Sequence, residues 1–271
     1  MSLDTLEKAQ NTVILEIFDA QNKSVRRFTS DDKPYTIPDV NIPLYWIRPQ
    51  QILSAEAGSH RFLWDMHYAP LDVPASYPIA AVYQNTAPDP TSPWVMPGIY
   101  TVKLTVNGKT YTQSFTIKKD PRIKTSPLQW QQIHDLSMQT YKGRQKAMQV
   151  LSEIKMIKNQ VKTLNAAVNG SLLENLKSFE QNLMAFEGAP RRFNVPNTEG
   201  VDFNKLDNAF AGIHNILHDT DMPATTQTIS ANQKAQQDLS SLLSKWAAFK
   251  TNDVAKLNAV LKGGGLDIIK L

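Results

Sequence analysis

The feature that most constrains this chain is a change in the period of its hydrophobic side chains partway along the sequence. Residues 97–106 and 109–118 alternate apolar and polar side chains with a period of two, which is typical of β-strands. Beyond Asp120-Pro121-Arg122 the apolar side chains recur at helical spacing almost to the end. One kind of element cannot satisfy both periods. The sequence therefore predicts two domains, β-structure in residues 1–121 and helices in residues 122–271.

The predicted β-domain consists of short strand-like runs joined by turns. Residues 12–18 and 24–28 are rich in β-branched and aromatic side chains and favour a hairpin, and residues 60–66 favour a further strand. Asn107 and Gly108 favour a type I′ turn between the last two runs, because both central positions of that turn need positive φ angles. Several short strands without helical spacing predict an immunoglobulin- or fibronectin-like β-sandwich.

Two long proline-rich segments, residues 31–59 and 69–97, interrupt this predicted domain. Proline cannot donate a hydrogen bond to a strand ladder, so we expect mostly irregular chain there. Irregular loops of such length are commonly functional or packed on a neighbour. Tyr45, Trp46 and Trp94 lie in these segments and are the candidate binding residues. Their rings could stack on carbohydrate, or they could bury against the core or a neighbouring domain.

The second predicted domain begins at residues 126–129, where Ser-Pro-Leu-Gln combines a capping box with proline at the first helical position. A second capping-box pattern runs from Ser171 to Glu174. Four apolar stripes have helical spacing: Ile154, Ile157, Val161 and Leu164; Leu172, Leu176, Phe179, Leu183 and Phe186; Leu206, Phe210, Ile213 and Leu217; and Leu239, Leu242, Trp246 and Phe249. Four amphipathic helices with loops of modest length predict an antiparallel four-helix bundle.

Several functional classes are excluded by what the sequence lacks. With no cysteine, the chain has no disulfide, no thiolate metal site and no cysteine nucleophile. No apolar run reaches the length of a transmembrane helix, and Met1-Ser2-Leu3 leads straight into charged residues, so neither a membrane span nor a signal peptide is expected. The net charge of +4 is too small to favour nucleic-acid binding. There is no phosphate-binding or nicotinamide-binding glycine motif, and no cofactor is expected.

Two pairs of titratable side chains have spacings that enzymes use. His214 and His218 are four residues apart on a predicted helix, but a zincin helix needs Glu where this chain has Asn215, and also a third ligand. Asp65 and Glu56 offer two carboxylates, as glycoside hydrolysis requires. Nothing in the sequence brings that pair together. We therefore assign no catalytic residue and no metal site.

Four segments, in this order, resemble one protein family. They are residues 43–49 (Pro-Leu-Tyr-Trp-Ile-Arg-Pro), 58–65 (Gly-Ser-His-Arg-Phe-Leu-Trp-Asp), 97–102 (Pro-Gly-Ile-Tyr-Thr-Val) and 120–122 (Asp-Pro-Arg). Together they resemble the C-terminal region of large bacterial sortilin-like, Vps10-related proteins, also labelled BNR (Asp-box) repeat glycosyl hydrolases. The resemblance covers residues 12–125. It implies a parent protein with a long N-terminal β-propeller, followed by a sandwich and a helical segment.

The resemblance carries no catalytic residue into this chain. The Asp-box pattern Ser-x-Asp-x-Gly-x-Thr-Trp is absent here, so any hydrolase activity would belong to the propeller. What the resemblance implies is a non-catalytic accessory region of a larger exported bacterial protein, periplasmic or secreted. Its expected partner is the N-terminal β-propeller of the parent chain. The alternative is a glycoside hydrolase fragment that contributes carbohydrate-binding aromatic side chains.

Overall fold

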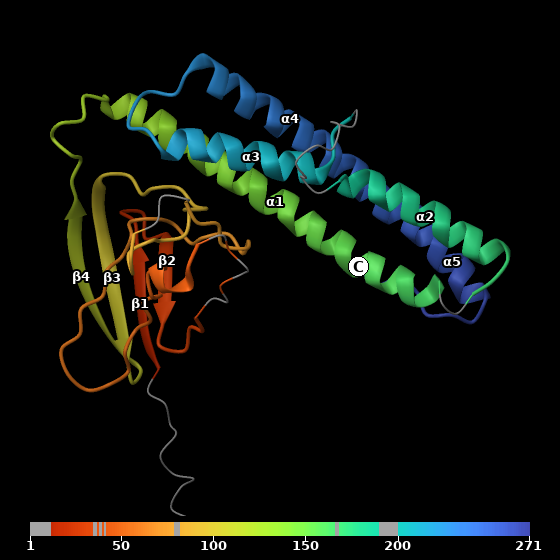
Figure 1. Cartoon of the computed structure of the whole chain (residues 1–271), viewed down its shortest axis with the longest axis horizontal. Helices are drawn as coiled ribbons and strands as arrows, with labels where there is room; N and C mark the ends of the chain where they lie inside the picture. Colours follow the sequence, from red (N-terminus) through yellow and green to blue (C-terminus); the bar gives the residue numbers. More distant parts are fainter. Residues whose placement is uncertain are drawn as a thin grey trace, which may run out of the picture. The chain divides into compact units, whose positions relative to one another are not determined.

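The computed structural model describes residues 12–34, 37, 40, 42–78, 82–165, 168–189 and 200–271. The chain divides into two compact units, Met1–His134 and Asp135–Leu271. In the described chain the first unit holds the strands and the second is helical (Figure 1). The division falls inside a helix that begins at Pro127, so the start of that helix belongs with the first unit. The predicted domain limit at residue 121 stays a prediction.

The first unit is built on one antiparallel sheet. Its strands are β1 (Val13–Phe18), β2 (Ser24–Thr29), β3 (Gly98–Val106) and β4 (Lys109–Ile117). They lie in the order β2-β1-β3-β4, so that the two hairpins meet through β1 and β3 (Figure 1). Four of the predicted strand runs are confirmed in this way, each with one bound that differs by one residue.

The turn between β3 and β4 forms where it was predicted. Asn107 has a φ angle of 52° and Gly108 one of 75°, the positive values that a type I′ turn needs. Val106 pairs with Lys109 across it, and Leu104 pairs with Tyr111. The turn therefore sets the register of the whole hairpin.

The sheet has one apolar face and one polar face. The buried cluster on the apolar side consists of Ile17, Val25, Val95 and Tyr100, with Phe28, Trp64, Tyr68, Phe115 and Ile117 packed against it. On the opposite face the hydroxyls of Thr105 and Thr110 lie 2.9 Å apart in a hydrogen bond. The ammonium group of Lys103 lies 4.1 Å from the centre of the Phe18 ring. Strand alternation thus places most of the apolar residues of β3 and β4 on the side that the loops cover, while Phe18 and Ile99 lie on the other face.

The predicted β-sandwich is wrong, because the described chain has a single four-stranded sheet and no second sheet faces it. Residues 60–66, predicted as a strand, form none; next to them His67 makes only an isolated bridge with Trp94. The main chain is tied there by hydrogen bonds from Val95 N to Met66 O (2.9 Å) and from Tyr68 N to Pro93 O (3.1 Å). Prolines around these residues remove the donors that a longer ladder would need. Loops therefore cover the apolar face in place of a second sheet.

The helical part consists of one long helix and several shorter ones. The helices are α1 (Pro127–Asn165), α2 (Ser171–Glu187), α3 (Phe203–His218), α4 (Thr226–Phe249) and α5 (Ala255–Gly263), with a π-helical segment, Lys250–Val254, between α4 and α5. In the described part of the first unit a 3-10 turn spans Leu44–Trp46. The apolar stripes found in the sequence supply most of the buried side chains of these helices.

The predicted four-helix bundle is also wrong. α3 packs on α4, whereas α2 packs on α5, which continues from α4 through the π-helical segment. α2 and α3 therefore follow each other along the other helices instead of lying side by side as two separate members of a bundle (Figure 1). Hydrophobic spacing defines the face that each helix buries, but it does not say whether two helices lie next to each other or end to end.

The helix starts show which capping signals were reliable. At α1 the Ser126 and Gln129 side chains form the predicted capping box, with Ser126 N donating to Gln129 Oε1 at 3.0 Å. At α2 the predicted box does not form, since Gly170 precedes the helix and no side chain caps it. At α3, Asp202 accepts a hydrogen bond from Lys205 N at 2.8 Å. An aspartate at this position satisfies one of the free N–H groups of the first turn.

Candidate functional site

The candidate binding residues Tyr45 and Trp46 lie in a segment that is held in place by a second loop. Ile47 forms an isolated parallel bridge with Thr86. On either side of it, Thr86 N donates to Trp46 O at 3.1 Å and Arg48 N donates to Thr86 O at 2.8 Å. Segments about forty residues apart in sequence are thus fixed side by side. Neither is part of the four-stranded sheet.

The loop at residues 82–86 is itself a closed turn. The Thr86 hydroxyl accepts a hydrogen bond from Val82 N (2.7 Å) and donates one to Val82 O (2.9 Å). The Arg48 guanidinium donates to Asn85 Oδ1 through Nε and Nη2, at 3.1 and 2.8 Å. Gln84 has a positive φ angle of 54°, which lets the chain reverse direction. Side-chain and main-chain bonds therefore fix the shape of this loop.

Four large apolar side chains stand out from this pair of loops. Leu44, Tyr45, Val82 and Tyr83 are 63%, 63%, 60% and 62% exposed, and we call them the tyrosine patch. The rings of Tyr45 and Tyr83 lie 6.2 Å apart at an angle of 52°. Clustered exposed apolar side chains of this kind mark interaction sites more often than single ones do. The patch is the best candidate functional site in the described part of the chain.

A small core contains buried side chains that flank Leu44 and Tyr45 of the tyrosine patch in the chain. The buried residues of this core are Ile42, Ile47 and Tyr77, and Val40 and Ala75 pack against them. This core is separate from the cluster on the sheet. Because the patch rests on packed side chains and hydrogen-bonded main chain, its exposed rings are presented on an ordered support.

The other candidate residues have different surroundings. Trp46 is partly buried, with its ring edge-on to Tyr45 at 6.3 Å and 81°. Trp94 is 42% exposed and its ring lies 3.7 Å from that of His67. The structure thus brings Tyr45 and Trp46 together, while Trp94 belongs to the loop that covers the sheet. Sequence reasoning did not select Leu44, which directly precedes Tyr45 in the chain. It also did not select Val82 or Tyr83, because only the pairing of the two loops brings their segment to Tyr45.

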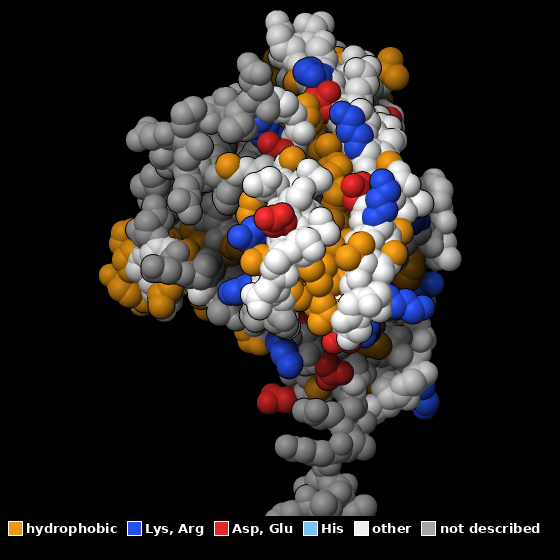
Figure 2. Space-filling view, turned by 90° about the vertical axis from the view of Figure 1, so that its right-hand side faces the viewer, with side chains coloured by type: hydrophobic (Ala, Val, Ile, Leu, Met, Phe, Trp, Pro, Cys, Tyr) orange, Lys and Arg blue, Asp and Glu red, His pale blue; other side chains and the backbone are white. Residues whose placement is uncertain are grey.

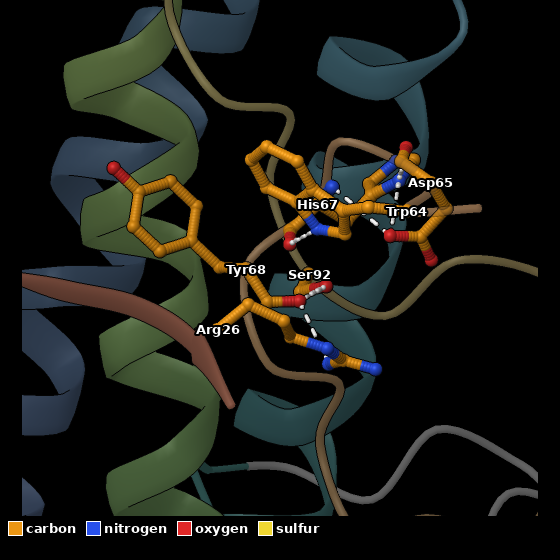
Figure 3. Close-up of polar contacts among 6 residues, drawn as sticks. All are labelled: Arg26, Trp64, Asp65, His67, Tyr68 and Ser92. Carbon is orange, nitrogen blue, oxygen red and sulfur yellow. Dashed lines mark hydrogen bonds and ion pairs between the residues drawn. The ribbon is translucent and has the colours of Figure 1, made fainter. Parts of the chain in front are cut away.

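A group of polar contacts lies where that covering loop meets the sheet (Figure 3). The Tyr68 carbonyl accepts hydrogen bonds from Arg26 Nη1 at 3.1 Å and from Ser92 Oγ at 2.8 Å. The indole N–H of Trp64 donates to the His67 carbonyl at 3.0 Å. Each of these bonds satisfies a main-chain carbonyl of an irregular segment. Their effect is to fasten the loop, since buried carbonyls without a partner are costly.

The carboxylate and imidazole within this group are also engaged with main chain. His67 is buried, and its Nδ1 lies 2.8 Å from the Asp65 carbonyl, which can only accept, so Nδ1 carries the proton. Asp65 Oδ1 accepts from His67 N at 3.1 Å. The Glu56 carbonyl is in turn bonded to His60 Nε2 at 2.9 Å. The contacts of Asp65 and Glu56 are local turn contacts of the kind that shape loops.

The two histidines of α3 share one face of the helix. The rings of His214 and His218 are 5.5 Å apart, and His214 is 3% exposed. His218 Nδ1 lies 3.1 Å from Asp219 Oδ1. In the part of the chain that the structure describes, no group of three His, Cys, Asp or Glu side chains could hold a metal ion.

The surface of the helical part carries charges of both signs. Seen from the end that holds α2 and α5, Lys and Arg side chains are spread among Asp and Glu, with apolar side chains visible between the helices (Figure 2). This face shows no block of one sign of the kind that nucleic-acid binding uses. Among the described residues, no helix combines the length and the apolar character that crossing a membrane requires.

Comparisons of the chain with protein-family models, with curated proteins and with solved structures find no match. The resemblance to bacterial sortilin-like proteins therefore stays a prediction. Function has to be argued from the surfaces of the molecule.

Proposed function

We propose that this chain is a non-catalytic accessory region of a larger exported bacterial protein, where it docks on the parent's N-terminal β-propeller through the tyrosine patch. The observation that carries the proposal is the exposure of Leu44, Tyr45, Val82 and Tyr83, each at least 60%, on loops that hydrogen bonds hold in shape. A surface that is already ordered loses little entropy on binding. Tyrosine is among the residues that most often anchor interfaces.

A protein partner fits this patch better than a carbohydrate does. A sugar-binding platform would present aromatic rings in one plane. Here the ring of Tyr45 is tilted by 52° from that of Tyr83 and by 81° from that of Trp46. Leu44 and Val82 add aliphatic surface, which has no directional preference for a sugar ring. A mixed aliphatic and aromatic patch is typical of the centre of a protein interface.

The polar groups of the first unit support a non-catalytic role. Asp65, His67 and Arg26 each make a hydrogen bond to a main-chain atom of the loops. General acid–base catalysis needs such groups directed at a substrate position. Their present contacts instead explain how a proline-rich loop stays packed on a sheet.

The proposal is tested by pull-down and by calorimetry of this chain with the separately expressed propeller of its parent. We expect Tyr45→Ala and Tyr83→Ala each to raise Kd by about tenfold or more, as truncation of a central interface aromatic does. Ile99→Ala is the matched control, because Ile99 is 60% exposed on β3 and lies outside the patch. Wild-type affinity in both patch variants would refute docking through these loops. Loss of binding in Ile99→Ala alone would place the interface on the sheet.

A further inference from the structure

β4 is an outer strand of the sheet, and its one charged side chain, Lys109, lies at its start. It is nine residues long, and its residues from Lys109 to Ser114 are exposed. Between Lys109 and Ile117 it has no proline, glycine or charged side chain. The opposite edge strand β2 is shorter, carries two arginines and has an irregular register next to β1. Natural proteins usually protect an edge strand with features like those of β2, so the edge of β4 is the one at which a further strand can pair.

The register of the hairpin tells which main-chain groups of β4 face outward. Across a two-residue I′ turn the flanking residues, here Val106 and Lys109, form a hydrogen-bonded pair. Hydrogen-bonded and non-bonded pairs then alternate along the ladder. Consequently β4 turns the N–H and C=O groups of every second residue away from β3. These residues are Thr110, Thr112, Ser114 and Thr116.

We propose that β4 pairs with β4 of a second copy of this chain, antiparallel about a two-fold axis at Gln113, to give a continuous eight-stranded sheet. In that register Thr112 lies opposite Ser114 of the other copy and Thr110 opposite Thr116. Both pairs consist of residues whose N–H and C=O groups point outward, so these groups find main-chain partners. In the single chain the Ser114 carbonyl accepts a hydrogen bond from Gln113 Nε2 at 3.1 Å, which the pairing would replace. A two-fold interface of this kind brings the same surface of both copies together.

The side chains are self-complementary in the same register. Lys109 lies opposite Ile117, so the charge at one end of the strand meets no like charge. Tyr111 lies opposite Phe115 on the apolar face. In the single chain Tyr111 is 60% exposed and lies on the same side of the sheet as Tyr100. The pairing would place Phe115 of the other copy beside the Tyr111 ring.

Neighbouring registers are worse for definite reasons. Sliding the second strand by two residues in one direction would place Lys109 opposite Lys119, and like charges directly opposite are destabilising. Sliding it in the other direction would place Thr116 opposite Gly108 in the turn and leave Ile117 without a partner. The Gln113-centred register alone uses the full length of β4 without opposing two lysines. A second copy is therefore the partner that the sequence of this edge fits.

The first test is cysteine cross-linking, which is unambiguous because the chain has no cysteine of its own. In Gln113→Cys the two sulfurs face each other at the axis, since directly opposite residues have Cβ atoms about 4.5–5.5 Å apart. Thr116→Cys is the matched control on the same strand. It lies six residues from its own copy across the axis, which is about 20 Å. We expect mild oxidation to convert Gln113→Cys to a covalent dimer and to leave Thr116→Cys monomeric. Equal cross-linking of the two variants would overturn the proposal.

Sedimentation equilibrium gives the second test. We expect the wild-type chain to show a dimer mass at micromolar concentration and Thr112→Pro to show a monomer mass. Proline at this position removes an outward N–H without breaking the ladder to β3. An unchanged circular dichroism melt would show that Thr112→Pro still folds; if it does not fold, the cysteine comparison decides. A wild-type chain that stays monomeric throughout the micromolar range would refute self-pairing. The patch variants Tyr45→Ala and Tyr83→Ala should leave the dimer intact, so this proposal and the docking proposal fail independently.

Discussion

The packing of α1 against α3 makes a sharp prediction at Gly143. Gly143 lies inside α1, and a Cβ atom built there would come within 2.5 Å of Cζ and 2.8 Å of Cε1 of Phe210. Phe210 is fully buried, so its ring cannot move aside into solvent. Gly212, inside α3, has nothing within 4 Å of the same position. The two glycines thus differ in their surroundings while both adopt helical backbone.

Two opposing effects set the expected magnitudes. Replacing a helical glycine by alanine stabilises the helix by about 1 kcal/mol, because alanine has a smaller loss of backbone entropy on folding. Forcing an extra methyl group into a packed core costs about 1–3 kcal/mol. Gly212→Ala should therefore raise the free energy of unfolding by up to about 1 kcal/mol. Gly143→Ala should lie about 1–3 kcal/mol below Gly212→Ala, at or below the wild-type value.

The assay is urea unfolding followed by far-ultraviolet circular dichroism, which reports mainly on the helices. A second variant checks the cause: Phe210→Leu should reduce the difference between Gly143 and Gly143→Ala, because a smaller side chain leaves room for the methyl group. If Gly143→Ala and Gly212→Ala stabilise the chain equally, the close approach of α1 to the Phe210 ring does not exist. α3 would then not pack on the face of α1 that contains Gly143.

Two further predictions concern the sheet. Gly108→Val should destabilise the first unit by about 1–3 kcal/mol, because a β-branched residue is strained at a φ angle of 75°. Gly98→Val, where the φ angle is not positive, should cost less. Equal shifts of the melting temperature in the two variants would contradict the predicted turn. The pKa of Tyr100 is raised to about 12, mainly by burial, so the neutral phenol contributes stability below pH 10 that is lost as the pH rises toward 12. Tyr100→Phe removes the 2.7 Å hydrogen bond to Met96 O and should lower the free energy of unfolding by about 1 kcal/mol at pH 7. Between pH 10 and 12 the stability of this variant should fall less than that of the wild type. Unfolding curves of the variant and the wild type at alkaline pH would show the difference.

Local patterns in the sequence predicted local structure well. The hairpin at Asn107 and Gly108 depends on two adjacent φ angles and formed with the expected register. The capping box of Ser126 and Gln129 depends on residues within one turn and is present. The similar pattern at Ser171 fails, because Gly170 occupies the capping position instead. Helix boundaries are thus decided by competition between neighbouring residues, which a pattern alone does not resolve.

The arrangement of elements could not be predicted in the same way. Strand-like runs predicted a sandwich because short strands usually need a second sheet to bury their apolar face. Here Trp64 and Val95, both outside the sheet, take that place. The stripes of α2 and α3 are equally ambiguous, since they do not tell that α3 packs on α4 whereas α2 packs on α5. Contacts between distant segments determine how the strands and helices pack, and the local hydrophobic period does not predict these contacts.

The candidate site could not be predicted from the sequence either, because it also depends on contacts between distant segments. Tyr45 and Tyr83 are thirty-eight positions apart, and only the bridge between Ile47 and Thr86 makes them neighbours. The abundance of proline does not tell which of these loops forms a binding site. Proline lowers the conformational entropy of the unfolded chain, and this also stabilises loops that only cover the sheet. The loop around Trp64 and Val95 has that structural role, since its apolar side chains are turned onto the sheet. The loops around Tyr45 and Tyr83 are fixed by comparable bonds yet leave their largest side chains in solvent. That difference in exposure between two similarly ordered loops, and not their composition, separates the candidate interface from the layer that completes the fold.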